Sequence, residues 1–176
     1  MSQVIYELDP AHTSVHFSVR HMMVSNVRGE FTKVSGAVTF DSDNPSNSSV
    51  ETAIEAASIH TRDDQRDAHL RSADFLDVEK FPILTFRSTN AEPKGDGGIV
   101  TGDLTIHGVT RKVTLDVEGP TSEIKDPWGK ARIGATATTK LSRKDFGLVW
   151  NTSLEAGGVL VGDEVKITID VEPVRV

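Results

Sequence analysis

Residues 100–117 read VTGDLTIHGVTRKVTLDV and contain two runs in which apolar and polar side chains alternate. Alternation with a period of two places successive side chains on opposite faces of a β-strand. If Gly108 and Val109 form a two-residue type II′ turn, Leu104 lies opposite Val113, and apolar residues face apolar residues along both strands. This segment therefore predicts a β-hairpin with one buried face.

The same alternation recurs toward both ends of the chain, in residues 13–20 and 164–171. Between Phe31 and Val38 the apolar positions change from odd to even, which predicts a bulge or sharp bend near Gly36. Roughly eight strands, mostly joined in sequence, predict an antiparallel meander. The fold class is therefore expected to be all-β.

One segment departs from the strand pattern. Thr61-Arg62-Asp63-Asp64 resembles a capping box and opens a charged stretch with few β-branched residues. We expect one short helix, inserted around residues 62–72.

A sheet with many one-sided strands must bury its apolar face, and closure into a barrel also removes exposed edges. About eight strands leave an interior wide enough for one small ligand, as in lipocalins. Gly102, Ala135 and Ala137 are small residues on predicted inner faces, and aromatic residues make up only 6% of the chain. We therefore expect residues 1–176 to form a single β-barrel domain whose interior is underfilled by its own side chains.

Composition excludes several classes of function. The 176 residues carry a net charge of −7, and no segment gathers lysine and arginine into a stripe, so nucleic acid is not an expected partner. The absence of cysteine excludes disulfides and thiolate metal sites. No apolar run approaches the ~20 residues of a membrane helix. The start of the chain lacks a signal-peptide pattern, so we expect a cytoplasmic protein, or a periplasmic one if a leader has been removed.

Several segments of the chain, in this order, resemble the YceI-like family of lipocalin-like, polyisoprenoid-binding proteins. They are Leu8–Ser14, Val19–Met22, His69–Leu76 with Phe81-Pro82, Gly102–Thr110, Asp126–Gly129, Arg143–Asn151 and Leu160–Val165. The resemblance covers nearly the whole chain. It implies an extended barrel, commonly dimeric, that binds a long isoprenoid lipid such as a polyprenyl phosphate or an isoprenoid quinone in its lumen. A homodimer is therefore an expected assembly.

The resemblance and the strand patterns together predict a non-enzymatic protein that binds, stores or transports an isoprenoid lipid. The apolar residues expected to line the lumen are Val15, Phe17, Val19, Phe40, Ile54, Phe86, Leu104, Ile106, Val113, Leu115, Phe146, Leu148, Trp150, Ile167 and Ile169. No cofactor is expected.

Four polar side chains are candidates for holding a lipid head group, and each has an alternative. His21 either donates to a phosphate or quinone oxygen or bonds a loop carbonyl. Arg71 either donates two hydrogen bonds to the head group or pairs with Asp74. Arg143 belongs either to a charged mouth or to an ordinary turn, and Arg111 lies at the inner edge of the hairpin or extends into solvent.

Two further hypotheses compete with the carrier. In the enzyme alternative, His21 is an acid or base at a lipid head group, Asp145 orients it and Arg71 binds phosphate. In the structural alternative, the barrel is filled and binds no ligand. His12 and His16 have the spacing of a helical zinc pair, but on a strand they lie ~13 Å apart, so no metal site is expected.

Overall fold

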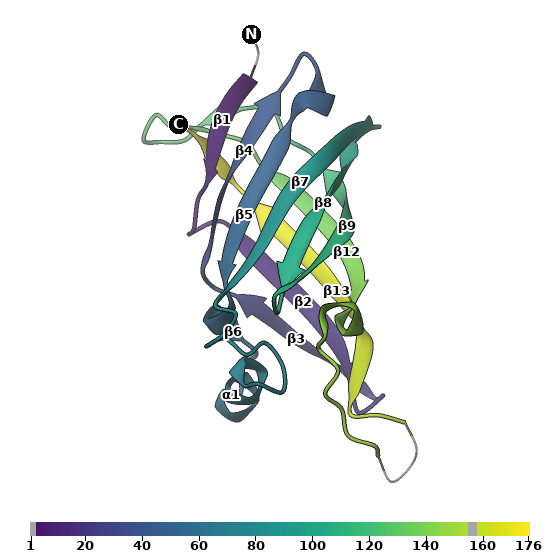
Figure 1. Ribbon diagram of the computed structural model, residues 1–176. Coiled ribbons are helices and arrows are strands. Elements are labelled where there is room, and N and C mark those ends of the chain that lie inside the picture. Colours follow the sequence, from purple (N-terminus) through teal and green to yellow (C-terminus); the bar gives the residue numbers. More distant parts are fainter. Residues whose placement is uncertain (1–2, 155–157) are drawn as a thin grey trace.

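The computed structural model describes residues 3–154 and 158–176, and most of these residues lie in β-strands (Figure 1). The strands are β1 (Gln3–Leu8), β2 (Ser14–His21), β3 (Ser25–Phe31), β4 (Val34–Asp41), β5 (Ser49–Glu55), β6 (Ile59–His60), β7 (Ile83–Lys94), β8 (Gly97–Ile106), β9 (Val109–Glu118), β10 (Ile124–Lys125), β11 (Ala131–Arg132), β12 (Ala135–Ser142), β13 (Val161–Val171) and β14 (Pro173–Arg175). The remaining elements are helix α1 (Asp64–Arg71) and the 3-10 turns η1 (Pro45–Asn47), η2 (Ala56–Ser58) and η3 (Arg143–Phe146).

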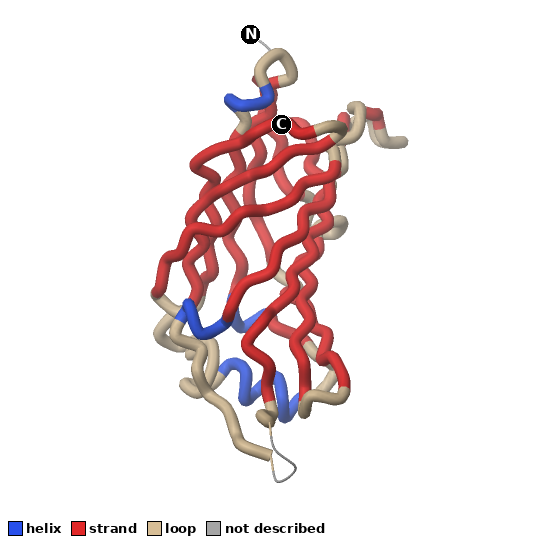
Figure 2. The backbone as a smooth tube through the Cα atoms, turned by 90° about the vertical axis from the view of Figure 1, so that its right-hand side faces the viewer, coloured by secondary structure: helices blue, strands red, loops and turns tan. Residues whose placement is uncertain are grey.

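All strands belong to one antiparallel sheet, in the order β10-β11-β14-β1-β4-β5-β7-β8-β9-β12-β13-β2-β3-β6. Two short chain links join one side of this order to the other, because β1 continues into β2 through residues 9–13 and β3 continues into β4 through residues 32–33. The sheet therefore curls round into a long barrel (Figures 1 and 2). The predicted all-β, lipocalin-like barrel is confirmed.

The strands are more numerous than predicted, in part because the run that contains Phe31 and Val38 is interrupted where its pairing partner changes. β3 pairs with β2, whereas β4 pairs with β1 and β5. The break lies at Thr32 and Lys33, whose backbone N–H groups donate to the carbonyl and the hydroxyl of Ser58. The shift of apolar residues from odd to even positions after Phe31 therefore reflects this break at residues 32–33, which precedes Gly36.

The hairpin of β8 and β9 forms with a register different from the predicted one. Its turn residues are His107 and Gly108, with φ angles of 56° and 72°, and Leu104 pairs with Arg111 instead of Val113. Positive φ at both turn positions is typical of a type I′ turn, which places glycine second, whereas the predicted type II′ turn places it first. A shift of two residues keeps every side chain on its face, so the predicted inner face is retained.

Helix α1 lies at one end of the barrel (Figure 1). It begins after Asp63, whose side chain accepts a hydrogen bond from the Arg66 backbone N–H at 3.0 Å. Thr61, the expected capping residue, is instead buried and donates through its backbone N–H to the Asp67 carboxylate at 2.9 Å. The predicted helix is therefore shorter at its start, because Asp63 supplies the cap.

The turn geometry predicts unequal costs for two glycine substitutions. A Cβ atom at Gly108 would lie 2.6 Å from the Phe81 ring, whereas one at Gly95, which also has a positive φ (58°), would meet no atom within 4 Å. Gly95→Ala should lower the free energy of unfolding by about 1 kcal/mol through backbone strain alone. Gly108→Ala should cost at least twice as much in urea denaturation, and equal losses would contradict this packing.

Candidate ligand-binding cavity

The curled sheet encloses a cavity of about 770 Å³. The predicted lumen residues that line it are Val15, Phe17, Val19, Phe40, Ile54, Phe86, Leu104, Ile106, Val113, Leu115, Leu148, Trp150, Ile167 and Ile169. They come from strands on all sides of the barrel and from the segment that follows η3. The period-two pattern thus predicts which side chains face inward, because neighbouring positions face solvent.

Phe146 does not lie on the cavity surface. It is 1% exposed and packs within the hydrophobic core beside the cavity. The prediction extended a strand pattern through Phe146, Leu148 and Trp150, but residues 143–146 form the 3-10 turn η3 and Gly147 follows with a φ of 76°. The strand period therefore does not apply at this position.

The open space comes from only some of the small inward residues. Ala135 and Ala137 in β12 line the cavity. Gly102 does not create space, because a Cβ atom built there would lie 2.4 Å from the Arg87 carbonyl oxygen and 2.6 Å from the Phe86 ring. The β12 side of the barrel is thus the underfilled side.

Helix α1 and the segment after η3 meet at the end of the cavity. The ring of His69 packs edge-on against Trp150 and Phe75, with centroid separations of 4.6 Å and 5.1 Å. Nε2 of His69 also lies 2.8 Å from an Asp74 carboxylate oxygen. His69 lines the cavity but was not among the predicted site residues, although it belongs to a segment that carries the family resemblance.

Among the four head-group candidates, only His21 lies on the cavity surface and has a side chain that is not already hydrogen-bonded within the described residues. His21 ends β2, is half-buried, and makes no side-chain hydrogen bond or ion pair with any residue in the described ranges. Arg66, from α1, also lines the cavity; its guanidinium donates to the Thr61 hydroxyl at 2.7 Å and to the Thr61 carbonyl at 2.6 Å.

Two of the predicted arginines lie away from the cavity. Arg71 donates to the backbone carbonyls of Ala57 and Ile59 at 2.9 Å and 3.0 Å, so it fastens α1 to the barrel. It does not pair with Asp74, which bonds His69 instead. Arg111 pairs with Leu104 and is exposed, and its guanidinium donates to the carbonyl of Thr110 at 3.3 Å.

Arg143 touches the cavity but is held by the backbone. Its side chain is buried and donates to the carbonyls of Leu148 and Trp150 at 2.6 Å and 2.9 Å, and to those of Gly162 and Val161 at 2.8 Å and 3.3 Å. Burial lowers the pKa of the guanidinium, while the Asp163 carboxylate opposes that shift. Arg143 therefore joins η3, the segment after it and β13 into one unit.

The residues of the enzyme alternative do not share a site. His21 lines the cavity, whereas Asp145 is exposed beside Arg111 in a separate surface hollow. Arg71 is bound to backbone carbonyls. The fold therefore does not assemble the proposed acid, orienting carboxylate and phosphate-binding arginine.

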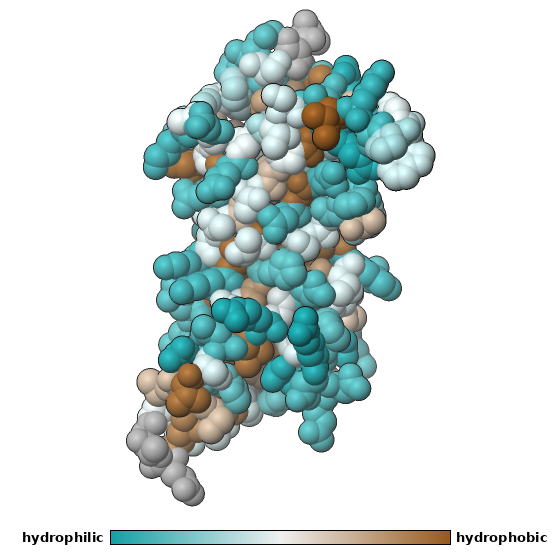
Figure 3. Space-filling view, turned by 180° about the vertical axis from the view of Figure 1, so that it is seen from behind, coloured by the Kyte–Doolittle hydropathy of each residue, from teal (hydrophilic) through white to brown (hydrophobic). Residues whose placement is uncertain are grey.

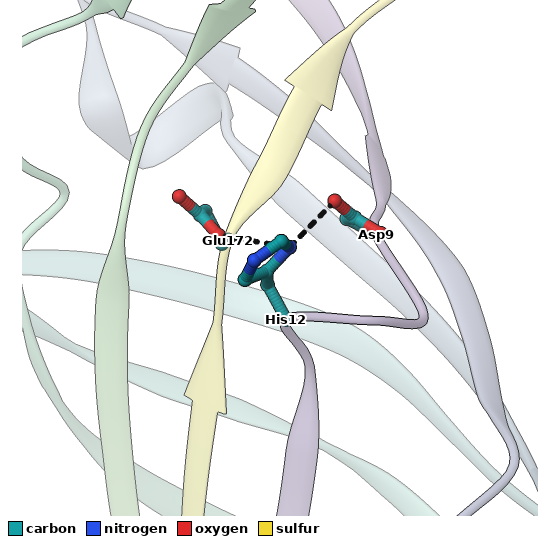
Figure 4. Close-up of side chains that lie close together, drawn as sticks. All are labelled: Asp9, His12 and Glu172. Carbon is teal, nitrogen blue, oxygen red and sulfur yellow. Dashed lines mark hydrogen bonds and ion pairs between the residues drawn. The ribbon is translucent and has the colours of Figure 1, made fainter. Parts of the chain in front are cut away.

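A charged cluster that sequence reasoning missed lies where β1 passes into β2. Nδ1 of His12 lies 2.9 Å from Asp9 and 3.4 Å from Glu172 (Figure 4). Arg132 donates to Asp9 at 2.6 Å and to Asp126 at 2.7 Å. The available signal was that Asp9 and Asp126 both lie in segments that carry the family resemblance.

This cluster has the composition of a metal site but already contains a cation. The potential ligand atoms of Asp9, His12 and Glu172 lie within 4.8 Å of one another. Arg132 is 14% exposed and contacts both carboxylates, at 2.6 Å for Asp9 and 3.9 Å for Glu172. Its guanidinium supplies the positive charge that a metal would supply, so the cluster works as an ion-pair network that ties β11 to the β1–β2 link.

The carbonyl contacts of Arg143 predict a large cost for a conservative substitution. Arg143→Lys should lower the free energy of unfolding by about 3 kcal/mol, because an ammonium group cannot satisfy the same set of buried carbonyls. Arg111→Lys is the matched control, and its cost should stay within about 0.5 kcal/mol because the side chain is exposed. Similar denaturant midpoints for the two variants would contradict the role assigned to Arg143.

The Arg132 network predicts a dependence of stability on pH. The hydrogen bond from Arg132 is the main reason that the pKa of Asp9 lies well below its ordinary value, with His12 adding to it, and Arg132 lowers the pKa of Asp126 as well. A depressed carboxyl pKa contributes stability above the ordinary value and loses it as the pH falls, here from about pH 5 downward.

The thermal midpoint of the wild-type protein should therefore fall more steeply between about pH 5 and pH 3 than that of Arg132→Gln, whose carboxylates lack the cation. Arg87→Gln, at an exposed ion pair with Glu51, should retain the wild-type slope. An unchanged acid slope in Arg132→Gln would contradict the assignment.

Comparison with known proteins agrees with this architecture. A family model described as the YceI-like domain matches residues 6–173. Protein YceI of Salmonella newport is 40% identical over 172 residues, covering 97% of this chain and 86% of the relative. The crystal structure of Burkholderia cenocepacia BcnA, 26% identical, covers 94% of this chain and 98% of its own, with a TM-score of 0.79.

A polyisoprenoid binding domain from Saccharophagus degradans shares the fold at 15% identity, with a TM-score of 0.68 over 98% of this chain and 99% of its own. No helix in the described residues is long and apolar enough to span a membrane. With the family model matching nearly its full length, the chain belongs to the YceI-like family.

Proposed function

We propose that this chain is a non-enzymatic binding protein that stores or transports a long-chain isoprenoid lipid, of the polyprenyl phosphate or isoprenoid quinone type, with the tail inside the barrel. The observation that carries the proposal is the cavity of about 770 Å³, walled mainly by aliphatic and aromatic side chains. A related fold is described as a polyisoprenoid binding domain, which supports the same ligand class.

Apolar burial is the main driving force in this proposal. Each square ångström of tail removed from water contributes about 25 cal/mol, so a long tail binds without many polar contacts. The elongated barrel suits a chain molecule. A filled structural barrel is not supported, since a cavity of this size is far larger than a packing defect.

The head group would lie at the α1 end of the cavity. His21 is an uncommitted hydrogen-bonding group on the cavity surface, and Arg66 of α1 also lines the cavity, with Nε and one terminal nitrogen already bonded to Thr61. Arg143 contributes mainly by holding the surrounding backbone. A head group with one or two acceptor oxygens fits these donors.

Native ligand extraction tests the proposal. Organic extraction of the purified protein followed by mass spectrometry should recover an isoprenoid lipid. Ala137→Trp, which fills the underfilled side, should reduce the recovered lipid at least tenfold, because a bulky ring displaces tail contacts. Thr138→Trp, on the exposed outer face of the same strand, should recover as much lipid as the wild type.

Wild-type protein that yields no apolar ligand, and that binds no added prenyl lipid, would refute the carrier proposal. Equal recovery from both tryptophan variants would place the lipid outside the cavity.

A further inference from the structure

We propose that the chain docks on an uncharged lipid bilayer through a small apolar tip beside the α1 end of its cavity. The apolar tip consists of Met22, Met23, Val24 and Val159, which are 44%, 56%, 75% and 39% exposed. The proposal rests on the proposed function, because a carrier of a membrane-resident lipid needs a way to receive it.

The tip is formed by two chain segments held together. The backbone N–H of Met22 donates to the carbonyl of Leu160 at 2.8 Å, and the Met23 sulfur lies against Gly158. Hydrophobic side chains gather at this end of the molecule, at the lower left of Figure 3. The turn between β2 and β3 lies at this end of the barrel (Figure 1).

The tip is continuous with the cavity. His21, immediately before Met22, lines the cavity, as do Leu160 and Val161, immediately after Val159. Arg20 also lines it and donates to the carbonyl of Met23 at 3.2 Å. A lipid leaving a bilayer in contact with the tip would therefore meet the cavity entrance directly, beside the Arg20 side chain.

The local charge pattern matches an uncharged bilayer. The chain has a net charge of −7, yet residues 13–29, which include the turn of the tip, contain no aspartate or glutamate. On the neighbouring segment the sequence carries Glu155, Asp163 and Glu164, so this end combines cationic and anionic groups, as the head groups of a zwitterionic bilayer do. Arg20 and Arg28 are exposed in β2 and β3 and can contact phosphates at the interface.

The two methionines of the tip have strained backbone conformations, so their large apolar side chains occur there at a cost in conformational energy. Met22 and Met23 have φ angles of 50° and 60°, and the Val24 N–H closes the turn on the carbonyl of His21 at 3.1 Å. A type I′ turn prefers Asn-Gly, because non-glycine residues are strained at positive φ. The β8–β9 turn follows this preference with Gly108, whereas the tip does not. Strain of this kind points to a function for the side chains.

A second copy of the chain fits the tip less well. A stable dimer buries about 800 Å² and 20–30 residues on each partner, whereas the tip offers four exposed apolar side chains on a projecting end. Binding at the interface of a bilayer scales with the apolar area that is buried and needs no extended complementary surface, which suits a small projecting cluster.

Flotation with phosphatidylcholine vesicles tests the proposal. The wild-type protein should float with the vesicles, and salt at about 0.5 M should not release it, because the attraction is apolar. Met22→Asn with Met23→Gly should lower the partition coefficient about tenfold or more by removing two apolar side chains. Its thermal midpoint should equal or exceed that of the wild type, because the new turn relieves strain.

Trp128→Ser is the matched control, because Trp128 is 81% exposed in the β10–β11 turn, away from the cavity. It should partition like the wild type. Failure of the wild type to float, loss of partitioning in Trp128→Ser equal to that in the turn variant, or wild-type partitioning by the turn variant would each overturn the proposal. A change of oligomeric mass in the turn variant, measured by sedimentation equilibrium, would overturn it in favour of an interface between copies.

Binding of farnesol in solution separates this proposal from the proposed function. The turn variant should bind farnesol like the wild type, since none of the substituted residues lines the cavity. If neither protein binds farnesol or longer prenyl lipids while the wild type still floats with vesicles, the proposed carrier function is refuted and the proposed docking on a bilayer is supported.

Discussion

Burial of the apolar face of a single sheet is the interaction on which the rest of the structure depends. The two chain links, at residues 9–13 and 32–33, carry β1 and β3 across to the opposite side of the strand order, so the sheet can curl over its own inner face. Because β12 contributes alanines to that face, the curled sheet encloses space as well as side chains. The cavity is thus a consequence of how the sheet closes.

Polar groups stabilise the places where the strand pattern stops. Arg132 neutralises the carboxylates around the β1–β2 link, and Arg143 satisfies the carbonyls of the irregular segment after η3. The edge-on packing of His69 against Trp150 then joins this segment to α1. One end of the cavity is therefore bounded by elements that are fixed by specific contacts, and those contacts leave His21 uncommitted.

The sequence predicts the regular part of this structure well. Alternation identifies the inward side chains even where the hairpin register was wrong, because the error of two residues preserves the face. It fails where local geometry replaces the strand period, as at Phe146 in the turn η3. Arginine roles are the least predictable, because the partners of Arg71 and Arg143 are backbone carbonyls that carry no sequence signal. The family resemblance, not the strand pattern, supplied the class of lipid.

The central claim is that burial of an apolar tail in the barrel drives binding. The most direct measurement is the affinity of the protein for prenyl alcohols of increasing length with one common head group. The account predicts that affinity rises with each isoprene unit, by up to about 0.8 kcal/mol per buried methylene, until the tail fills the cavity and the affinity levels off. An affinity that does not change with tail length would contradict it.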